Sequence, residues 1–268
     1  MKLSVITINY NNALGLKKTV ASVFDQTLND FEYIVIDGGS TDGSKELIEE
    51  NSSKLAYWVS EPDCGVYQAM NKGITKASGE YLLFLNSGDC LSNPQSLQAA
   101  FDHRFTESIV YGDIQSNATG ELIQFPHQLK FSHFYHATIN HQASFIKRRL
   151  FVSYGLYNEA WKIASDWEFF IRCLFLYGET SLHLNQVITV FDFTDGISAR
   201  LANLHTMKLE RASILEQYFP GFKEDYRDME LLKSRIQERN QNSLKLNKHF
   251  VWLVRKIRNF FKNLVANS

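Results

Sequence analysis

Glu80-Tyr-Leu-Leu-Phe-Leu-Asn-Ser-Gly-Asp89 joins an unbroken apolar run to a polar turn. A run of this length without polar alternation predicts a strand buried on both faces, as in a parallel sheet covered by helices. Similar runs occur upstream, separated by segments with helical spacing of apolar residues. The predicted strands are 3–8, 31–36, 56–59 and 80–85, and the predicted helices are 14–27, 44–50 and 66–76. This alternation predicts an α/β fold with a mainly parallel central sheet flanked by helices.

The pattern changes after residue 107. Strands are expected at 108–111, 114–116, 122–125, 141–146 and 187–193, helices at 150–154 and 166–177, and a helical pattern from residue 203 onward. We expect one domain over residues 1–200, with a first half at 1–112 and a second half at 113–200, followed by a helical extension over 201–268.

The composition limits the class of protein. The chain has 268 residues, of which 44% are apolar and 21% charged, which excludes a disordered chain. The formal net charge of −1 gives no overall attraction to nucleic acid. Three dispersed cysteines provide neither a disulfide framework nor a thiolate zinc site, and they suit a reducing compartment. Apolar runs are too short for a membrane span or a signal-peptide core, so we expect a cytoplasmic protein.

Polar clusters follow four of the predicted strands, at 9–12, 37–44, 63–65 and 86–89. The carboxyl ends of parallel strands lie at one edge of a sheet, and ligands bind beyond that edge. A single cluster of this kind is ordinary turn chemistry. Four clusters at the same edge predict a pocket.

Two of these clusters carry carboxylates suited to a nucleotide ligand. The glycines of Asp37-Gly-Gly-Ser-Thr-Asp-Gly-Ser44 permit close approach of the backbone to a ligand, and Asp37 can accept hydrogen bonds from a base or ribose. Asp89 can bind a hard divalent cation that bridges two phosphate oxygens. The simpler alternatives are a capped β–α turn for the first cluster and a turn residue or helix cap for Asp89.

Four motifs occur in a fixed order along the chain: Ser4-Val-Ile-Thr-Ile-Asn-Tyr-Asn-Asn12, Val35-Ile-Asp-Gly-Gly-Ser-Thr-Asp-Gly-Ser44, Asn71-Lys-Gly-Ile74 and Tyr81-Leu-Leu-Phe-Leu-Asn-Ser-Gly-Asp89. Their order and spacing resemble glycosyltransferase family 2. The resemblance extends to about Ile197 and includes Ala164-Ser-Asp-Trp-Glu168. The segment Ser60-Glu-Pro-Asp-Cys-Gly-Val-Tyr-Gln-Ala-Met-Asn-Lys-Gly73 is similar to the branch that builds bacterial exopolysaccharides, including colanic-acid-type and O-antigen chains.

This resemblance implies a GT-A fold, in which a nucleotide-binding α/β half precedes an acceptor half. It also implies a nucleotide-sugar donor and inversion at the anomeric carbon. Carried over by position, the donor-binding residues are Asn9 and Tyr10 beside the nucleobase, Asp37 on the base or ribose, Asp63 beside the nucleoside, Asn71 and Lys72 near the diphosphate, and Asn86. Asp89 is then expected to face a metal ion, and Asp166 to deprotonate the acceptor hydroxyl.

The metal motif departs from the family pattern. That pattern usually carries two or three carboxylates, whereas Asn86 and Gly88 stand here where acids often occur. Diphosphate oxygens and water can complete octahedral coordination around Asp89, so we expect Mg²⁺ or Mn²⁺, with weak affinity for the free ion. His141 is a candidate second ligand or acceptor contact. The alternative is a histidine satisfied within a strand.

Asp166 is the candidate catalytic residue. The acceptor hydroxyl is a poor nucleophile, so a carboxylate has to take its proton during attack. The cation and Lys72 would stabilise charge on the leaving diphosphate. Burial would raise the pKa of Asp166 and a helix N-terminus would lower it, which leaves the direction open. The alternative is a plain N-cap, and Glu168 is the second candidate base.

The C-terminal segment is basic and amphipathic. Seven of the 28 Lys/Arg residues and none of the 29 acidic residues lie from Arg239 to the end. One apolar stripe is formed by Phe250, Val254, Ile257, Phe261 and Leu264. We expect residues 248–265 to bind an anionic membrane surface, at the inner face of the cell membrane, where polyprenyl-diphosphate-linked saccharides are assembled. Packing on the body or on a second subunit is the alternative.

Together these features favour an inverting glycosyltransferase that moves a sugar, from a UDP-sugar by preference, to a hydroxyl of a lipid-linked oligosaccharide in bacterial surface polysaccharide biosynthesis. A nucleotide-sugar-binding scaffold without catalysis is one alternative, because Asp89 is a lone carboxylate. A nucleotidyltransferase is another, although residues 9–12 do not form the basic glycine-rich loop that it needs.

Overall fold

The computed structural model describes residues 2–193, 203–222, 224 and 227–239. The chain divides into two compact units, Met1–Ile214 and Leu215–Ser268. The first unit contains the sheet and every candidate site residue. No helix among the described residues is long and apolar enough to cross a membrane. The expected membrane-binding segment 248–265 lies outside the described residues.

Nine strands form a single sheet in the part of the chain that the structure describes. They are β1 (Leu3–Asn9), β2 (Phe31–Asp37), β3 (Tyr57–Ser60), β4 (Tyr81–Asn86), β5 (Cys90–Leu91), β6 (Ile109–Ser116), β7 (Leu122–Ile123), β8 (Ser144–Lys147) and β9 (Ser181–Phe191). Their order is β3-β2-β1-β4-β8-β6-β9-β5, and β7 pairs with β6.

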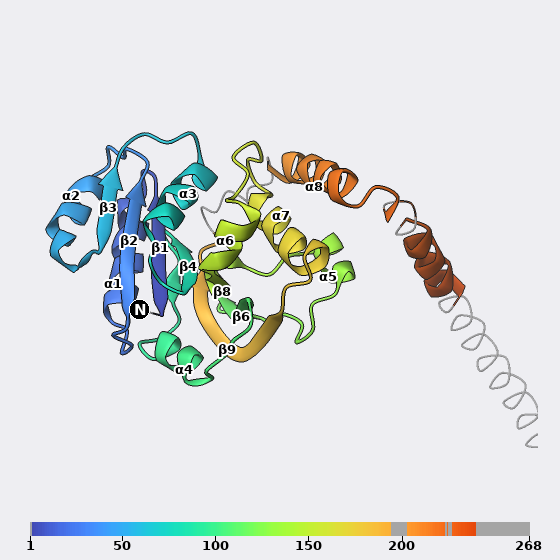
Figure 1. The fold of residues 1–268 in the computed structure, drawn as a ribbon, viewed down its shortest axis with the longest axis horizontal. Coiled ribbons are helices and arrows are strands. Elements are labelled where there is room, and N and C mark those ends of the chain that lie inside the picture. The colour runs from blue at the N-terminus through green and yellow to red at the C-terminus, as the bar shows by residue number, and fades with distance from the viewer. Residues whose placement is uncertain (1, 194–202, 223, 225–226, 240–268) are drawn as a thin grey trace, which may run out of the picture. The chain divides into compact units, whose positions relative to one another are not determined.

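The sheet is parallel in its first half only. Strands β3, β2, β1 and β4 lie side by side and are parallel (Figure 1). Strand β8 is antiparallel to both of its neighbours, β4 and β6, whereas β9 is parallel to β6. The α/β fold with flanking helices is therefore confirmed, and the parallel order ends at β4.

Helices cover both faces of the sheet. The described α-helices are α1 (Ala13–Phe24), α2 (Ser44–Glu50), α3 (Val66–Lys76), α4 (Ser96–Asp102), α5 (Phe131–His136), α6 (Arg148–Tyr154), α7 (Ser165–Ile171) and α8 (Leu204–Tyr218). On one face, α1, α2 and α4 share a core with Leu3 and Val5 of β1. On the other face, α3 approaches β1 so closely that a Cβ atom on Gly73 would lie 2.5 Å from Ile6.

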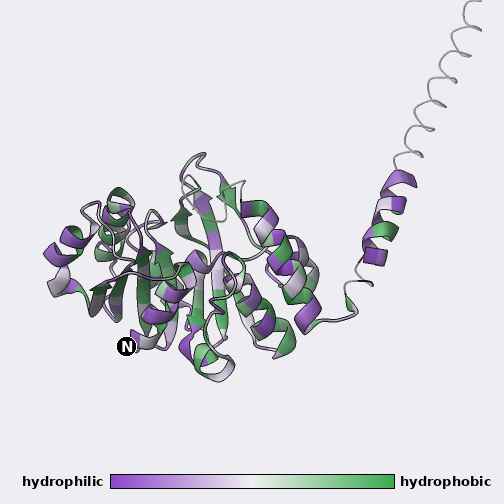
Figure 2. Ribbon diagram, turned by 90° about the horizontal axis from the view of Figure 1, so that it is seen from above, coloured by the Kyte–Doolittle hydropathy of each residue, from purple (hydrophilic) through white to green (hydrophobic). Residues whose placement is uncertain are grey.

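The core follows the apolar runs of the sequence. All seven residues of β1 are buried, as are five of the six residues of β4. Figure 2 shows hydrophobic residues along the central strands and mixed hydropathy on the surrounding helices. Burial of β4 on both faces is therefore confirmed.

Several elements differ from the sequence-based prediction: β5, α4 and α5 were not expected, and β9 begins at Ser181 rather than at residue 187. Strand β6 runs unbroken through Gly112, and a Cβ atom on this residue would lie only 2.6 Å from the backbone oxygen of Gln186. His141 lies in a 3₁₀ turn, His141–Ala143, that precedes β8. The helix expected over 166–177 is an α-helix to Ile171 and a π-helical turn from Arg172 to Leu176.

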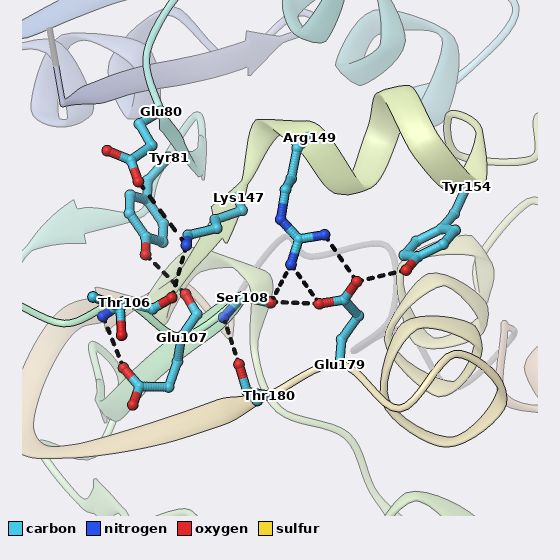
Figure 3. Close-up of polar contacts among 10 residues, drawn as sticks. All are labelled: Glu80, Tyr81, Thr106, Glu107, Ser108, Lys147, Arg149, Tyr154, Glu179 and Thr180. Atoms are coloured by element: carbon cyan, nitrogen blue, oxygen red, sulfur yellow. Dashed lines mark hydrogen bonds and ion pairs between the residues drawn. The ribbon is translucent and has the colours of Figure 1, made fainter.

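A paired polar cluster lies at the edge where β4, β6 and β9 begin, which we call the amino edge. The Glu179 carboxylate there accepts two hydrogen bonds from Arg149, at 2.9 and 2.6 Å (Figure 3). It accepts two more from the hydroxyls of Ser108 and Tyr154, both at 2.5 Å. The hydrogen bonds from Arg149, aided by the two hydroxyls, lower the pKa of Glu179 to about 2 against the effect of burial.

Candidate active site

The opposite edge, where β1, β2 and β4 end, is called the carboxyl edge. Asn9 and Asp37 are register partners there, and Asn9 Nδ2 donates to Asp37 Oδ1 at 2.7 Å. The fully buried Asp37 also accepts from the Ser40 N–H at 2.9 Å and from the Ser60 hydroxyl at 2.6 Å. Burial alone would raise the pKa of Asp37, but the hydrogen bonds from Ser40 and Ser60 lower it. Asp37 is therefore an anion that ties three strand ends together.

Tyr10 and Asp63 both lie close to Gly38. A Cβ atom at Gly38 would be 2.8 Å from Oδ2 of Asp63 and 3.1 Å from Cδ2 of Tyr10, so a side chain does not fit there. Tyr10 is 67% exposed, and burial raises the pKa of Asp63. An exposed ring beside a carboxylate offers a stacking face and a hydrogen-bond acceptor to a planar polar ligand.

Two amide oxygens at this edge are buried and have no hydrogen-bond partner among the described residues. They are Oδ1 of Asn9 at the end of β1 and Oδ1 of Asn86 at the end of β4. Buried polar atoms are almost always paired, so an exception requires a reason. A ligand that brings N–H or O–H groups to the edge would satisfy both oxygens.

Asn86, His141, Asp166 and Tyr67 form a hydrogen-bonded chain. The Asn86 amide donates to His141 Nε2 at 3.4 Å, which leaves the ring proton on Nδ1, and Nδ1 faces Asp166 Oδ2 at 3.0 Å. The Tyr67 hydroxyl lies 2.9 Å from the other oxygen, Oδ1, of Asp166. This chain joins α3, β4 and the His141 turn to the first turn of α7.

Asp166 is held as an anion. Burial would raise its pKa, but the hydrogen bond from His141, together with the Tyr67 hydroxyl, lowers it below the ordinary value. Its side chain is 15% exposed, so the carboxylate remains reachable. The sequence left open whether the pKa of Asp166 is raised or lowered, and the structure lowers it. A lowered pKa keeps the carboxylate ionised, and a general base must be ionised to accept a proton.

Asp89 is buried just beyond the end of β4. It accepts the Asp192 N–H at 2.9 Å, and a Cβ atom on Gly88, whose φ is +109°, would lie 2.7 Å from the Asp192 carboxylate. Burial raises the pKa of Asp89 to about 7, and the Asp192 N–H and His141 oppose this rise. A cation next to this carboxylate would stabilise its ionised form.

Asp89 is the candidate protein ligand for a divalent ion at this edge. Among the described residues, no group of three or more His, Cys, Asp or Glu side chains is arranged to hold a metal. Asp89 fits the role of single ligand because it is an oxygen donor with a destabilised charge, and other ligands would be diphosphate and water oxygens. Both ring nitrogens of His141 face protein groups, and the residue lies in a 3₁₀ turn rather than in a strand. A role for His141 as second ligand or acceptor contact stays a prediction.

Asn71 and Lys72 are engaged within the protein. The buried Asn71 amide donates to the backbone oxygen of Tyr157 and to Glu159, both at 2.9 Å, and accepts from the Tyr157 N–H at 3.1 Å. It therefore holds the 157–159 segment, and its expected place near the diphosphate stays a prediction. Lys72 pairs with Glu61 at 2.8 Å.

Glu168, the second candidate base, is buried in an ion pair and does not reach the site. Glu168 is 1% exposed and accepts a hydrogen bond from Arg172 at 2.8 Å within the same helix. A buried carboxylate in such a pair is committed to its partner. Asp166 is thus the one of the two acids that faces the chain of His141 and Tyr67.

Sequence reasoning missed Tyr67. It lies within a quoted motif, but nothing in the sequence connects it to Asp166, 99 residues away. Burial and the nearby Asp166 raise its pKa well above 10, so it stays a hydroxyl that donates. The carboxyl edge thus combines the exposed ring of Tyr10, the buried carboxylate of Asp89 and the oriented, ionised carboxylate of Asp166, which suits transfer of a group between two bound substrates.

The comparisons with known proteins agree with this arrangement. Residues 4–160 match glycosyl transferase family 2. A PGL/p-HBAD biosynthesis glycosyltransferase of Mycobacterium tuberculosis is 31% identical over 216 residues, covering 76% of this chain and 82% of the relative. An uncharacterized glycosyltransferase of the same species is 34% identical over 225 residues, covering 81% and 85%.

Solved structures share the fold at low identity. TarS of S. aureus, residues 1–349 with UDP-GlcNAc, has a TM-score of 0.65 at 20% identity, covering 80% of this chain and 67% of that chain. A mannosyltransferase of Pyrobaculum calidifontis with GDP-Man and Mn²⁺ has a TM-score of 0.56 at 18% identity, covering 81% and 63%. The match spans 60% of the TarS chain that was solved with UDP.

Proposed function

Because this chain belongs to glycosyl transferase family 2, we propose that it transfers a sugar, with inversion at the anomeric carbon, from a nucleotide-sugar donor to a hydroxyl of a lipid-linked oligosaccharide. The observation that carries the proposal is Asp166, held as an anion by His141 and Tyr67 beside the carboxyl edge. A non-catalytic scaffold has no need of a base that is ionised and oriented in this way.

The donor is a nucleotide sugar, with a UDP-sugar preferred. The exposed Tyr10 ring would stack on the base, and Asn9 Oδ1 would accept a hydrogen bond from it. Asp63 would accept from the nucleoside, while Asp37 acts indirectly by holding Asn9. The UDP-GlcNAc and GDP-Man in the related structures support a donor of this class.

Asp89 would hold Mg²⁺ or Mn²⁺ together with the donor diphosphate. The ion would supply charge neutralisation for the departing diphosphate. Lys72 would contribute a second positive charge, for which its ammonium group would exchange Glu61 for a phosphate oxygen. Asn86 would donate to or accept from the donor through an amide whose oxygen has no partner among the described residues.

Asp166 would act as the general base in one displacement. The acceptor oxygen forms a bond to the anomeric carbon as the bond from that carbon to the diphosphate oxygen breaks. The hydroxyl proton passes to the Asp166 carboxylate, and the nucleoside diphosphate leaves with the bonding electrons. His141 and Tyr67 fix the carboxylate so that an oxygen faces the acceptor.

We further propose that the acceptor is carried on a polyprenyl diphosphate in bacterial surface polysaccharide biosynthesis, at the cytoplasmic face of the membrane. This part rests on the basic amphipathic pattern of residues 248–265 and on the resemblance of Ser60–Gly73 to exopolysaccharide enzymes. Each basic group near an anionic surface contributes roughly 1 kcal/mol to binding.

The test is a donor panel on the full chain. UDP, GDP, dTDP and CMP are titrated by calorimetry with Mn²⁺ and then with EDTA, and nucleotide release from the matching sugars is measured. We expect one nucleotide to bind, binding to weaken in EDTA, and Asp166→Asn to abolish release without loss of binding. Failure of all four nucleotides to bind, or full activity of the variant, would overturn the proposal.

A further inference from the structure

A carboxylate of helix α8 binds the backbone of residues 162–164, which precede the candidate base Asp166. Glu210 is 8% exposed, and its carboxylate accepts hydrogen bonds from three consecutive backbone N–H groups. The donors are Lys162 at 2.7 Å, Ile163 at 3.0 Å and Ala164 at 3.0 Å. Hydrogen bonds to a charged acceptor are roughly twice as strong as neutral ones, so this contact fixes the path of the backbone.

The same segment is held from its other side. The Tyr67 hydroxyl shares its one proton between two acceptors, the backbone oxygen of Ile163 at 2.6 Å and Oδ1 of Asp166 at 2.9 Å. Ile163 is therefore clamped through its N–H by Glu210 and through its carbonyl by Tyr67. Asp166 follows three residues later, in the first turn of α7, so its position depends on this clamp.

The next residue of α8, Arg211, lies over the first turn of α7. Its guanidinium carbon is 4.9 Å from the centre of the Trp167 ring, in a cation–π arrangement. Its positive charge interacts favourably with the Asp166 carboxylate. Arg211 Nε is buried without a hydrogen-bond partner among the described residues, so the side chain is held there by the ring and by charge.

We propose that Glu210 and Arg211 are positioning residues of the transferase, which orient the base Asp166 toward the acceptor. Both lie on α8, beyond the predicted domain of residues 1–200. This inference rests on the proposed function. Glu210 fixes the backbone before Asp166, and Arg211 fixes Trp167 beside it. A misplacement of about 1 Å at a reacting group costs about 100-fold in rate, so loss of the clamp acts on the chemical step more than on donor binding.

The test compares Glu210→Ala and Glu210→Gln with the matched control Glu216→Ala, at an exposed glutamate of the same helix. Release of UDP from UDP-GlcNAc with Mn²⁺ is the first activity measured, or release from whichever sugar nucleotide the panel identifies. We expect Glu210→Ala to lower kcat about 10- to 100-fold with the donor KM within about twofold. Glu210→Gln keeps one acceptor oxygen and should recover part of the loss, while the control matches the wild type.

Hydrogen exchange provides a readout that does not need turnover. Amide protection at residues 162–164 should fall in Glu210→Ala, while protection in β1, β2 and β4 stays as in the wild type. Unchanged protection at 162–164, or a kcat within about twofold of wild type in both variants, would overturn the inference. An equal loss of kcat and of sheet protection in both variants would also overturn it. If the wild type releases no nucleotide, the proposed function fails, and exchange alone still decides whether Glu210 holds the segment.

Arg211 is tested by Arg211→Met and Arg211→Lys, with Lys208→Met, an exposed position on the same helix, as control. We expect Arg211→Met to lower kcat about tenfold at unchanged donor KM, because the charge beside Asp166 is lost. Arg211→Lys keeps the charge, so its kcat should lie between that of the wild type and that of Arg211→Met. Wild-type kcat in Arg211→Met would remove Arg211 from the proposal.

Discussion

At the amino edge of the sheet, the Glu179 carboxylate accepts four hydrogen bonds from Arg149, Ser108 and Tyr154 (Figure 3). At the carboxyl edge, the amide oxygens of Asn9 and Asn86 are buried and have no partner among the described residues. An unpaired buried polar group costs about 1–3 kcal/mol. The protein thus satisfies its polar groups at one edge and leaves acceptors for a ligand at the other.

The comparison separates what stabilises the fold from what performs the chemistry. A cavity of about 420 Å³ opens at the amino edge between Glu80, Lys147 and Val152, away from the candidate site. The chemically informative features, a displaced pKa at Asp89 and an oriented base at Asp166, lie at the carboxyl edge. Substitutions at the two edges should therefore differ in kind.

The largest expected effect is at the base. Asp166→Asn removes the only proton acceptor of the proposed reaction and should lower kcat by about 100- to 10,000-fold. Donor affinity should stay within about twofold, because the base does not contact the nucleotide in the proposed arrangement. Initial-rate kinetics and calorimetry measure the two quantities. Asp25→Asn, at an exposed position after α1, serves as control, and a mere tenfold loss in Asp166→Asn would contradict the assignment.

Asp89→Asn should separate activity from stability. Loss of the metal ligand should lower kcat/KM by at least about 100-fold and remove the EDTA sensitivity of nucleotide binding. The midpoint of thermal unfolding without nucleotide at pH 8 should be unchanged or higher, because a buried carboxylate whose pKa is raised to about 7 is costly to ionise. Lower stability together with retained EDTA sensitivity would mean that Asp89 is a structural residue.

Glu179→Gln at the amino edge should show the reverse behaviour. It should lower the free energy of unfolding by about 1–3 kcal/mol at pH 7, by weakening charge-assisted hydrogen bonds, and leave kcat unchanged. Chemical denaturation and the same rate assay measure these quantities. A change in kcat without a change in stability would break the comparison between the two edges.

The stabilising effect of Glu179 also has a predicted pH dependence. Its pKa in the folded state is about 2, below the ordinary value of 4.5, so its contribution is fully present above pH 4.5 and is lost as the pH falls toward 2. The difference in unfolding free energy between wild type and Glu179→Gln should therefore shrink across that window. A constant difference from pH 6 to pH 3 would show that the ion pair is not its source.

The smallest effect is expected at Tyr10. Its ring is 67% exposed, so Tyr10→Ala should leave the unfolding free energy unchanged. Loss of a base-stacking surface should weaken nucleotide binding by about tenfold. Calorimetry with UDP measures this, and Tyr10→Phe, which keeps the ring, should bind like the wild type. Equal affinity of the Ala and Phe variants would remove the stacking role.

The sequence predicts the first half of the fold well because its signals are local. The helices at 44–50 and 66–76 match α2 and α3 to the residue, since each is bounded by turn-forming residues and short strands. The continuity of β6 was not predictable, because the glycine inside it is required by the distant Gln186 rather than by a turn.

In the candidate site, too, local features could be predicted and long-range contacts could not. The proximity of Asn9 and Asp37 could be predicted, because both end parallel strands. The partners that orient Asp166 could not, because contacts between Tyr67 and Asp166 or between Glu210 and the 162–164 segment depend on the tertiary fold. Motif reading finds the reacting groups, and only the structure finds what holds them.

The clamp around Ile163 has a consequence for the order of events during synthesis. The carboxylate at Asp37 gathers residues 9–60, so the nucleotide edge can form while the rest of the chain is still being made. The clamp instead joins Ile163 to Tyr67, 96 residues earlier, and to Glu210, 47 residues later, so it cannot form before Glu210 is made. Long-range contacts form late. A nascent chain would therefore hold a nucleotide before it could transfer a sugar, and refolding should restore binding before turnover.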